Sequence, residues 1–149
     1  MQGKVSNEYD SNDFGLETWV QNQLKMLPKG SKILDAGAGE QRYRRYCSDM
    51  QYTSQDFCQY NGNTSDGRGL DSGNWDTSHT DIVCDITEIP VADDEFDAVL
   101  CTEVFEHIPD PIKALKELMR VLKRGGTYLN GSILQPDTYG SIPLLFWLQ

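Results

Sequence analysis

Short apolar runs recur along this chain, and helix-like or polar stretches separate them. A continuous apolar run bounded by turn residues is typical of a buried strand, whereas apolar positions three and four residues apart indicate a helix. The runs predict strands at Lys32–Ala36, Gln51–Phe57, Asp81–Cys84, Phe96–Thr102 and Thr127–Ser132. Strands that alternate with helices or long connections favour a parallel, right-handed α/β sheet with both faces covered.

Helices are predicted on either side of the first strand. The apolar positions of Asp13–Leu27 recur at three and four residues, and Pro28 ends that segment. Glu40–Met50 is predicted to be a second helix. The polar residues 1–12 are expected to be loose, which leaves residues 13–149 as a single domain. Within it, residues 58–80 are rich in Gly, Asn, Asp and Ser and predict a long polar insertion loop.

A third helix carries the clearest boundary signals. Asp110 suits the N-cap position, and Pro111 suits the first helical position because its missing N–H has no partner there anyway. Gly125 is predicted to close the helix. The apolar stripe predicted to face the core consists of Ile112, Leu115, Met119 and Leu122.

Charge and cysteine usage narrow the function classes. The 149 residues carry a net charge of −10, from 23 acids against 13 bases, so the chain is a poor candidate for binding nucleic acid or an anionic membrane. The cysteines form no CxxC pair, and we predict neither a metal site nor a disulfide framework. No apolar run approaches the roughly 18 residues of a membrane span, and no signal-peptide pattern is present. We expect a cytoplasmic location.

Acidic or polar side chains stand at the ends of four successive predicted strands. The carboxyl ends of parallel strands meet at one edge of a sheet, where ligands bind. An acid about twenty residues after a glycine turn suits a ribose diol, because a carboxylate accepts both hydroxyl protons. The strand-end residues are Asp35, Asp56, Asp85, and the pair Thr102 and Glu103.

The turn after the first strand holds two glycines, Gly37 and Gly39, which allow the backbone to approach a ligand closely. A dinucleotide-binding GxGxxG pattern would need a third glycine where Arg42 stands. Asp35, directly before the turn, would repel a pyrophosphate, which prefers bare N–H groups. The turn therefore favours a ligand with a cation or hydroxyl groups. The alternative is that both glycines serve only the turn itself.

Several motifs in order now resemble a known family. LDAGAG follows the first strand, CDITEIP the third, and FDAVLCTEVFEHIPDP leads through a helix to RGG. Together they resemble the class I S-adenosylmethionine-dependent methyltransferases that act on small molecules, over about Ile33–Ser132. The resemblance implies a Rossmann-like parallel sheet of about five strands with flanking helices, and S-adenosyl-L-methionine as cofactor.

The resemblance also implies roles for the strand-end residues. The turn would pass under the methionine part of the cofactor, with Asp35 near its ammonium, and Asp56 would hold the ribose hydroxyls. Asp85 would accept from the adenine amino group, with Ile86 offering a backbone N–H; alternatively, Asp85 only caps the following turn. The cofactor-binding residues implied in this way are Asp35, Ala36, Gly37, Gly39, Asp56, Phe57, Asp85, Ile86, Thr102 and Glu103.

Catalysis would follow from the same motif set. If the acceptor is a hydroxyl or an amine, a base helps to remove its proton, and His107 and Glu106 are the candidates nearest the site in sequence. His107 could instead be a hydrogen-bonding residue without a catalytic role. The polar 58–80 segment resembles that of methyltransferases of polysaccharide biosynthesis, so a sugar or polysaccharide precursor is the expected acceptor.

The C-terminus departs from the family pattern. The family continues past the fifth strand with a helix and antiparallel strands, whereas only an atypical tail, residues 133–149, remains here, so the domain looks truncated. This motivates a second hypothesis, a non-catalytic cofactor-binding or regulatory module. The uncovered edge of Thr127–Ser132, together with the apolar tail, predicts a homodimer. The alternative is a tail that folds back over the sheet as a short helix.

Overall fold

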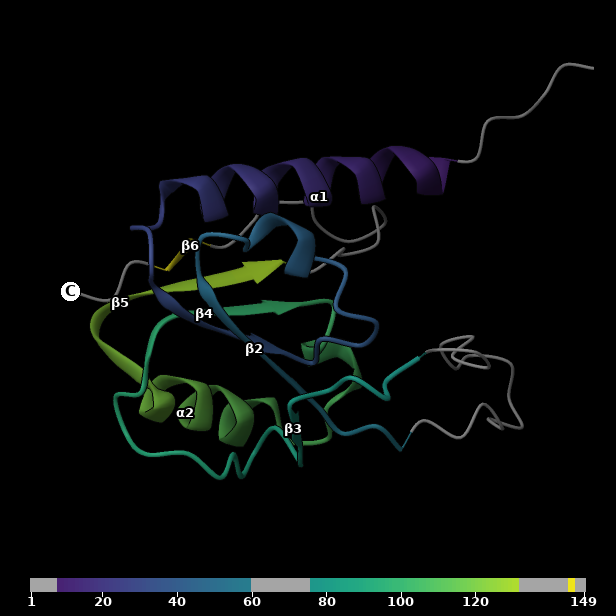
Figure 1. Cartoon of the computed structure of the whole chain (residues 1–149). Coiled ribbons are helices and arrows are strands. Elements are labelled where there is room, and N and C mark those ends of the chain that lie inside the picture. Colours follow the sequence, from purple (N-terminus) through teal and green to yellow (C-terminus); the bar gives the residue numbers. More distant parts are fainter. Residues whose placement is uncertain (1–7, 60–75, 132–144, 147–149) are drawn as a thin grey trace, which may run out of the picture.

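The computed structural model describes residues 8–59, 76–131 and 145–146, and it shows an α/β fold built on one sheet (Figure 1). The strand order is β3-β2-β1-β4-β5-β6. Strands β1 to β5 pair in parallel, and β6 pairs antiparallel with β5. The Rossmann-like fold class is thereby confirmed. The strands are β1 Lys32–Ala36, β2 Gln51–Asp56, β3 Ile82–Val83, β4 Phe96–Thr102, β5 Leu122–Gly131 and β6 Leu145–Phe146.

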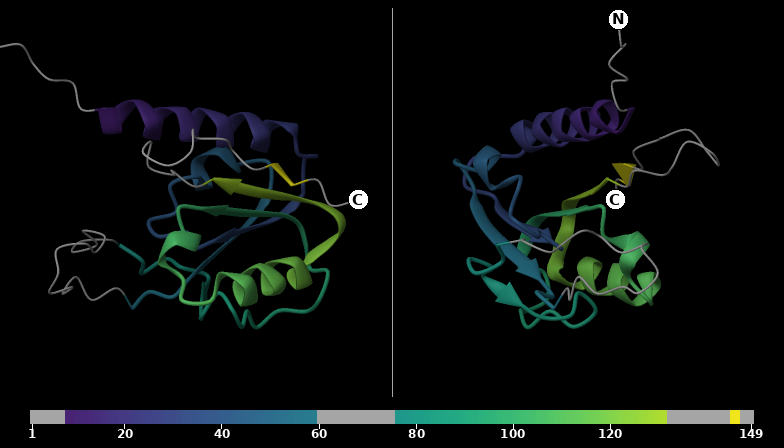
Figure 2. Two further views of the ribbon diagram at one scale, coloured as in Figure 1. Left: turned by 180° about the vertical axis from the view of Figure 1, so that it is seen from behind. Right: turned by 90° about the vertical axis from the view of Figure 1, so that its right-hand side faces the viewer.

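Helices cover both faces of this sheet. Helix α1, Glu8–Met26, lies on one face and helix α2, Pro111–Val121, on the other (Figures 1 and 2). Successive residues of a strand point to opposite faces. Ile33 of β1 accordingly packs in a cluster with residues of α1, while Leu34 packs in a second cluster with residues of α2. No helix among the described residues is long and apolar enough to cross a membrane.

The segment between β1 and β2 corrects the predicted helix Glu40–Met50. It consists of turns and one short 3₁₀ helix, η1, Arg44–Tyr46. Gln41 has a positive φ of 59°, which an α-helix does not permit. The N–H of Arg44 then bonds to the carbonyl of Gln41, three residues back, as in a 3₁₀ turn.

Glu17 of α1 fastens this segment to the helix. Its carboxylate accepts hydrogen bonds from Arg42, at 2.9 Å, and from Arg45 and Tyr46. The hydrogen bonds from Tyr46 and Arg42 lower the pKa of Glu17 to about 2. The helix itself begins at Glu8, so residues 8–12, which the sequence predicted to be loose, belong to it.

Helix α2 begins as predicted but buries a different stripe. Asp110 Oδ1 accepts the N–H of Lys113 at 2.9 Å, which confirms the N-cap. The predicted stripe was wrong at its start, because Ile112 is 63% exposed and Leu115 is 38% exposed. The predicted end was also wrong: Leu122 is already extended and pairs with Phe96 in the sheet, well before Gly125. The buried residues of the helix are Ala114, Leu118 and Val121.

The far edge of β5 is not open along its whole length. In β6, Phe146 pairs with Tyr128 and Leu145 with Leu129, so the tail returns as a short antiparallel strand rather than a helix. The open edge that the dimer prediction assumed was therefore wrong at these two positions, and one short antiparallel strand is present after all. The rest of the tail, residues 132–144 and 147–149, lies outside the described residues, and the homodimer stays a prediction.

Candidate cofactor site

A pocket of about 350 Å³ opens at the carboxyl edge of the sheet. Its walls come from residues at or just after the carboxyl ends of β1, β2, β3 and β4, so parts of the chain far apart in sequence meet there. This is the edge at which ligands bind in open parallel sheets. The residues that line it are Gly37, Gln55, Phe57, Gln59, Asp85, Ile86, Val104, His107, Ile108 and Pro109.

The N–H groups of the glycine turn are hydrogen-bonded within the protein. The N–H groups of Gly37 and Ala38 donate to the backbone carbonyl of Gln55, at 2.8 and 2.9 Å. The N–H of Gly39 donates to Asp56 Oδ2 at 2.9 Å. A phosphate-binding loop needs such N–H groups to point at the ligand, whereas these three are committed to β2. The turn therefore lacks the arrangement of free N–H groups that a phosphate-binding loop presents.

Gly37 is required at its position for two reasons. Its φ of 70° lies in the left-handed region, which disfavours other residues. A Cβ atom there would also lie 2.4 Å from Cγ2 of Val104, which follows β4. The turn after β1 and the segment after β4 thus meet at van der Waals distance across the pocket wall only because this residue is glycine.

Gln55 is a site residue that sequence reasoning missed. Its side chain is 1% exposed; Oε1 accepts the N–H of Gly37 at 3.2 Å, and Nε2 donates to the carbonyl of Cys84 at 2.7 Å. The amide therefore joins the turn after β1 to the end of β3. The available signal in the sequence was an amide residue directly before the strand-end acid Asp56, inside a predicted buried strand. An amide buried there must find hydrogen-bond partners, because an unpaired buried polar group destabilises the fold.

Asp35 lies away from the pocket wall. Its carboxyl group is 2% exposed, and the hydroxyl of Tyr52 donates to its Oδ2 at 2.5 Å. Burial raises the pKa of Asp35, and the hydrogen bond from Tyr52 opposes this effect only in part, so that the net pKa is about 7. The side chain lies on the same strand face as Ile33, on the α1 side of the sheet. The structure thus places this residue behind the turn rather than in the pocket; its neighbour Ala36 is fully buried in the core.

Asp56 is likewise turned inward. It is 2% exposed, and its oxygens accept the N–H of Gly39 and the N–H of Cys58, the latter at 2.8 Å. It supports the glycine turn and does not line the described pocket. The next residue, Phe57, is 42% exposed and does line it.

Asp85 and Ile86 form the wall that follows β3. Asp85 is exposed, and its Oδ1 accepts both the N–H and the hydroxyl of Thr87 at 2.8 Å, which lower the pKa of Asp85. The residue therefore caps its turn and lines the pocket at the same time. Ile86 is 8% exposed and packs in the core cluster on the α2 side.

Of the residues predicted near the end of β4, His107 lines the pocket and the others do not. His107 is exposed on the 3₁₀ helix η2, Phe105–His107, and lines the pocket. Glu106 is exposed on the same turn but is not among the described lining residues. Thr102 is the last residue of β4 and Glu103 follows it, and neither is among the residues that line the pocket. The wall at this point is Val104.

Three residues with a strained backbone conformation lie at the same edge of the sheet. The non-glycine residues with positive φ include Gln41 after β1, Cys58 after β2 and Glu103 after β4. Such conformations cost energy and persist where the surrounding contacts hold them, which is common at functional sites. Gln41 is held by its side chain, which donates to the carbonyl of His79 at 2.8 Å.

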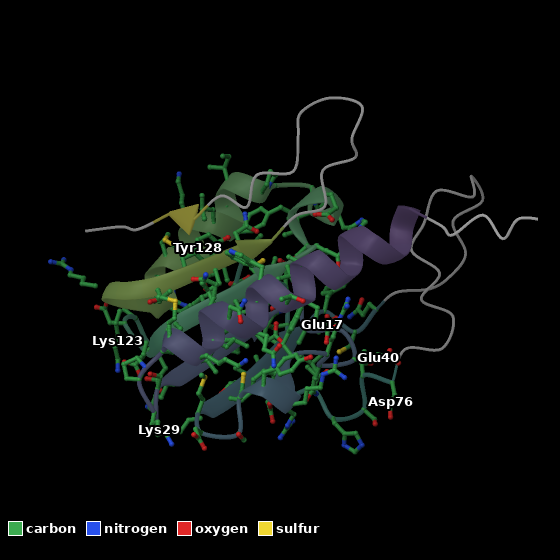
Figure 3. All side chains as sticks on the ribbon, turned by 90° about the horizontal axis from the view of Figure 1, so that it is seen from above. Glu17, Lys29, Glu40, Asp76, Lys123 and Tyr128 are labelled. Carbon is green, nitrogen blue, oxygen red and sulfur yellow. The ribbon has the colours of Figure 1, made fainter. Side chains whose placement is uncertain are left out.

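The returning end of the polar segment also reaches the glycine turn. Asp76 donates its N–H to Glu40 Oε1 at 3.3 Å, and the two residues lie side by side in Figure 3. Residues 76–80 are therefore fixed beside the site, whereas residues 60–75 lie outside the described residues. Within the described part of the chain, no group of three His, Cys, Asp or Glu side chains is arranged to hold a metal ion.

Comparisons with known proteins match this arrangement. A family model described as "Methyltransferase domain" matches residues 34–130. The human "Probable tRNA methyltransferase 9B" is 30% identical over 132 residues, which cover 82% of this chain and 27% of that protein. The demethylmenaquinone methyltransferase of Clavibacter sepedonicus is 35% identical over 135 residues, which cover 85% of this chain and 54% of that protein. The chain thus spans about a quarter to a half of the length of these relatives.

A solved structure shows the same fold. Haemonchus contortus phosphoethanolamine N-methyltransferase 2, in complex with S-adenosyl-L-methionine, superposes with a TM-score of 0.57 at 20% identity, over 78% of this chain and 27% of that one. The family match extends from β1 to the penultimate residue of β5 and includes the pocket residues from every strand end. The chain therefore belongs to the methyltransferase domain family, and its fold is that of the class I S-adenosylmethionine-dependent methyltransferases.

Proposed function

We propose that this chain binds S-adenosyl-L-methionine in the carboxyl-edge pocket and transfers its methyl group to a small-molecule acceptor. The observation that carries the proposal is the composition of the pocket wall. It combines the glycine turn at Gly37, the loop at Asp85 and Ile86, and the imidazole of His107. A cofactor surface and a group able to accept a proton thus share one recess.

The wall fits a nucleoside that carries no phosphate. Phe57, Ile86 and Val104 offer apolar surface to a planar base. Asp85 uses Oδ1 for its own turn, which leaves Oδ2 to accept from the amino group of adenine. Asp56 contributes by holding the N–H of Gly39, so its part is to shape the turn.

The chemistry required of the protein is orientation and proton removal. The bound cofactor supplies a methyl carbon that its sulfonium already activates. The acceptor forms a bond to this carbon as the bond from carbon to sulfur breaks, and the electron pair stays on sulfur; much of the rate comes from holding the partners in line. A hydroxyl or amine acceptor must also lose a proton, and we assign its removal to His107, because Glu106 does not reach the described pocket wall.

The net charge of the chain favours one class of acceptor over another. Relatives are named for tRNA and for demethylmenaquinone. A net charge of −10 disfavours a polyanion such as tRNA, since affinity for nucleic acid rises with the number of phosphates that Lys and Arg neutralise. A small neutral or cationic acceptor is therefore favoured. The sugar acceptor was inferred from residues 58–80, most of which lie outside the described residues.

Calorimetric titration with S-adenosylhomocysteine tests the cofactor site. We expect saturable binding; a folded protein that shows no binding at about millimolar ligand rejects the proposal. Methyl transfer from labelled cofactor is then measured against a phenol, an amine, an amino sugar and tRNA. Transfer to tRNA alone would overturn the small-molecule assignment. Binding without transfer to any of them would favour the non-catalytic binding module.

A further inference from the structure

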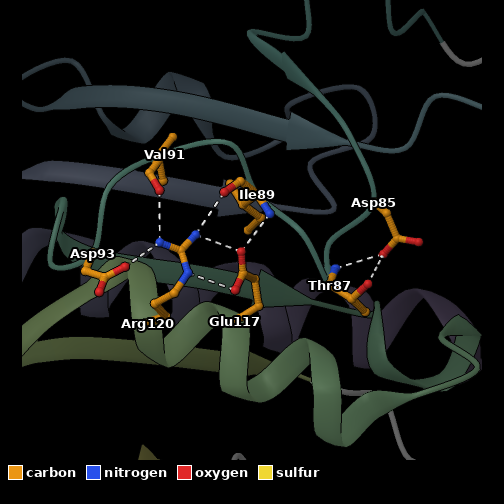
Figure 4. Close-up of polar contacts among 7 residues, drawn as sticks. All are labelled: Asp85, Thr87, Ile89, Val91, Asp93, Glu117 and Arg120. Carbon is orange, nitrogen blue, oxygen red and sulfur yellow. Dashed lines mark hydrogen bonds and ion pairs between the residues drawn. The ribbon is translucent and has the colours of Figure 1, made fainter.

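Arg120 of α2 uses all of its N–H donors within the protein (Figure 4). Its Nε and one Nη2 hydrogen bond go to the carboxylate of Glu117, at 2.9 and 2.8 Å. The other bonds go to the carbonyls of Ile89 and Val91, both at 2.9 Å, and to Asp93 at 2.7 Å. A planar guanidinium can hold this many partners in fixed directions, which an ammonium group cannot.

Glu117 completes the arrangement from the same helix. Its Oε1 accepts the N–H of Ile89 at 2.7 Å as well as the bond from Arg120. The backbone N–H and C=O of Ile89 are therefore both held by α2 side chains. Charge-assisted hydrogen bonds of this kind are stronger than neutral ones, so the loop is fastened at this residue and again at Val91.

The fastened loop is the one that forms the pocket wall. Asp85 and Ile86 lie four and three residues before Ile89, respectively, and the N–H of Glu88 bonds to the carbonyl of Asp85 at 3.0 Å. Ile86 and Ile89 are buried in the same core cluster. A rigid path therefore runs from α2 to the side chain of Asp85. Neither Arg120 nor Glu117 is among the lining residues of the pocket.

We propose that Arg120 and Glu117 are positioning residues, which fix the loop from Asp85 to Val91 so that Asp85 can recognise the adenine amino group of the cofactor. The inference rests on the proposed function, because it assigns the adenine end of the cofactor to this wall. The observed orientation of α2 keeps the pair beside this loop. Rotating the helix to bury Ile112 and Leu115 would carry the pair away from the loop.

The test separates positioning from general stability through ligand selectivity. S-inosylhomocysteine carries an oxygen where S-adenosylhomocysteine carries the adenine amino group, so Asp85 should discriminate between them. The variant Arg120→Lys keeps the charge and the aliphatic stem, but its ammonium group cannot reproduce the planar set of five N–H donors. Asp93→Asn is the matched control, because Asp93 is 73% exposed and contacts the same guanidinium from its solvent side.

For Arg120→Lys we expect the dissociation constant of S-adenosylhomocysteine to rise about tenfold, the effect of one or two lost hydrogen bonds, while that of S-inosylhomocysteine changes little. The preference between the two ligands therefore falls. Amide hydrogen exchange should accelerate at residues 86–91 and stay unchanged in β4. Asp93→Asn should keep the affinity and the preference of the unsubstituted protein.

Other outcomes overturn the inference in distinguishable ways. An Arg120→Lys protein that is folded and keeps the full preference shows that the pair is structural only. An equal loss of affinity for both ligands also shows that the pair is structural only. If Arg120→Lys does not fold, Glu117→Gln, which can still accept from Ile89, gives the same readout. Unsubstituted protein that binds neither ligand rejects the proposed function itself, and the positioning role with it.

Discussion

The hydroxyl of Tyr52 on β2 donates a hydrogen bond to Oδ2 of Asp35 on the neighbouring strand β1, across 2.5 Å and at a carboxyl group that is almost fully buried. The guanidinium of Arg44 lies over the ring of Tyr52, 5.5 Å from its centroid. The acid that introduces the glycine turn thus belongs to a packed polar cluster on the α1 side of the sheet. Its ionisation is consequently linked to the stability of the fold.

Asp35 should make the protein less stable as the pH rises. Its pKa is about 7 in the folded protein against an ordinary value of 3.8, so the folded state holds an extra proton between these values. Stability is therefore lost from about pH 4 to about pH 7 and then levels off, by at most about 4 kcal/mol. Asp35→Asn keeps an acceptor for Tyr52 and cannot ionise. In urea unfolding across this range, the stability of the variant relative to the unsubstituted protein should increase as the pH rises. If the free energies of unfolding of the two proteins run parallel with pH, the linkage is contradicted.

Gly37→Ala should destabilise the protein more than Gly30→Ala. Both glycines have positive φ, but a Cβ at Gly30 meets nothing within 4 Å, whereas one at Gly37 meets Val104. We expect a loss of about 1–2 kcal/mol at Gly30 and about 2–5 kcal/mol at Gly37, from the summed strain and overlap. Denaturant unfolding measures both. Adding Val104→Ala should restore part of the stability of Gly37→Ala, and failure to do so would exclude the steric cause.

Asp56→Ala and Asp85→Ala should have different effects. Removing the carboxylate of Asp56 leaves the buried N–H of Gly39 and that of Cys58 without their acceptor, so the free energy of unfolding should fall by about 1–3 kcal/mol along with cofactor affinity. Asp85 is exposed and holds only its own turn, so its removal should weaken S-adenosylhomocysteine binding and lower the melting temperature less than Asp56→Ala does. Calorimetry and thermal unfolding separate the two cases. Equal melting temperatures for both variants would argue against the inward role of Asp56.

His107→Gln should lower turnover without weakening cofactor binding. If the imidazole takes the acceptor proton, its loss should slow methyl transfer by about 10²–10⁴-fold. The dissociation constant of S-adenosylhomocysteine should stay within about twofold, since a wall residue without a cofactor hydrogen bond contributes little affinity. Glu106→Gln, one residue away and off the described wall, is the control and should keep its rate. A His107→Gln variant that loses affinity and rate together would make His107 a binding residue.

The sequence by itself determined the positions of β1 to β4, the edge of the sheet at which the pocket opens and the start of α2, whereas it missed the first residues of β5 and all of β6. The run Phe96–Thr102 is apolar enough to be buried on both faces, and such runs are strands in parallel sheets. The Asp110 and Pro111 pair fixes a helix start through local hydrogen bonding, which needs no distant partner. The order of motifs at strand ends likewise predicted the edge of the sheet at which the pocket opens.

Only the tertiary structure decided how these elements are turned. Two stripes of α2 have helical spacing, and the stripe that is buried, Ala114, Leu118 and Val121, is the one that leaves Arg120 and Glu117 within hydrogen-bond distance of Ile89. Asp35 and Gln55 are both polar residues near strand ends, yet one faces the core on the α1 side and the other bridges the pocket wall. Side-chain period and propensity are local properties of the chain, whereas the partner that a buried polar group finds depends on which strands become neighbours.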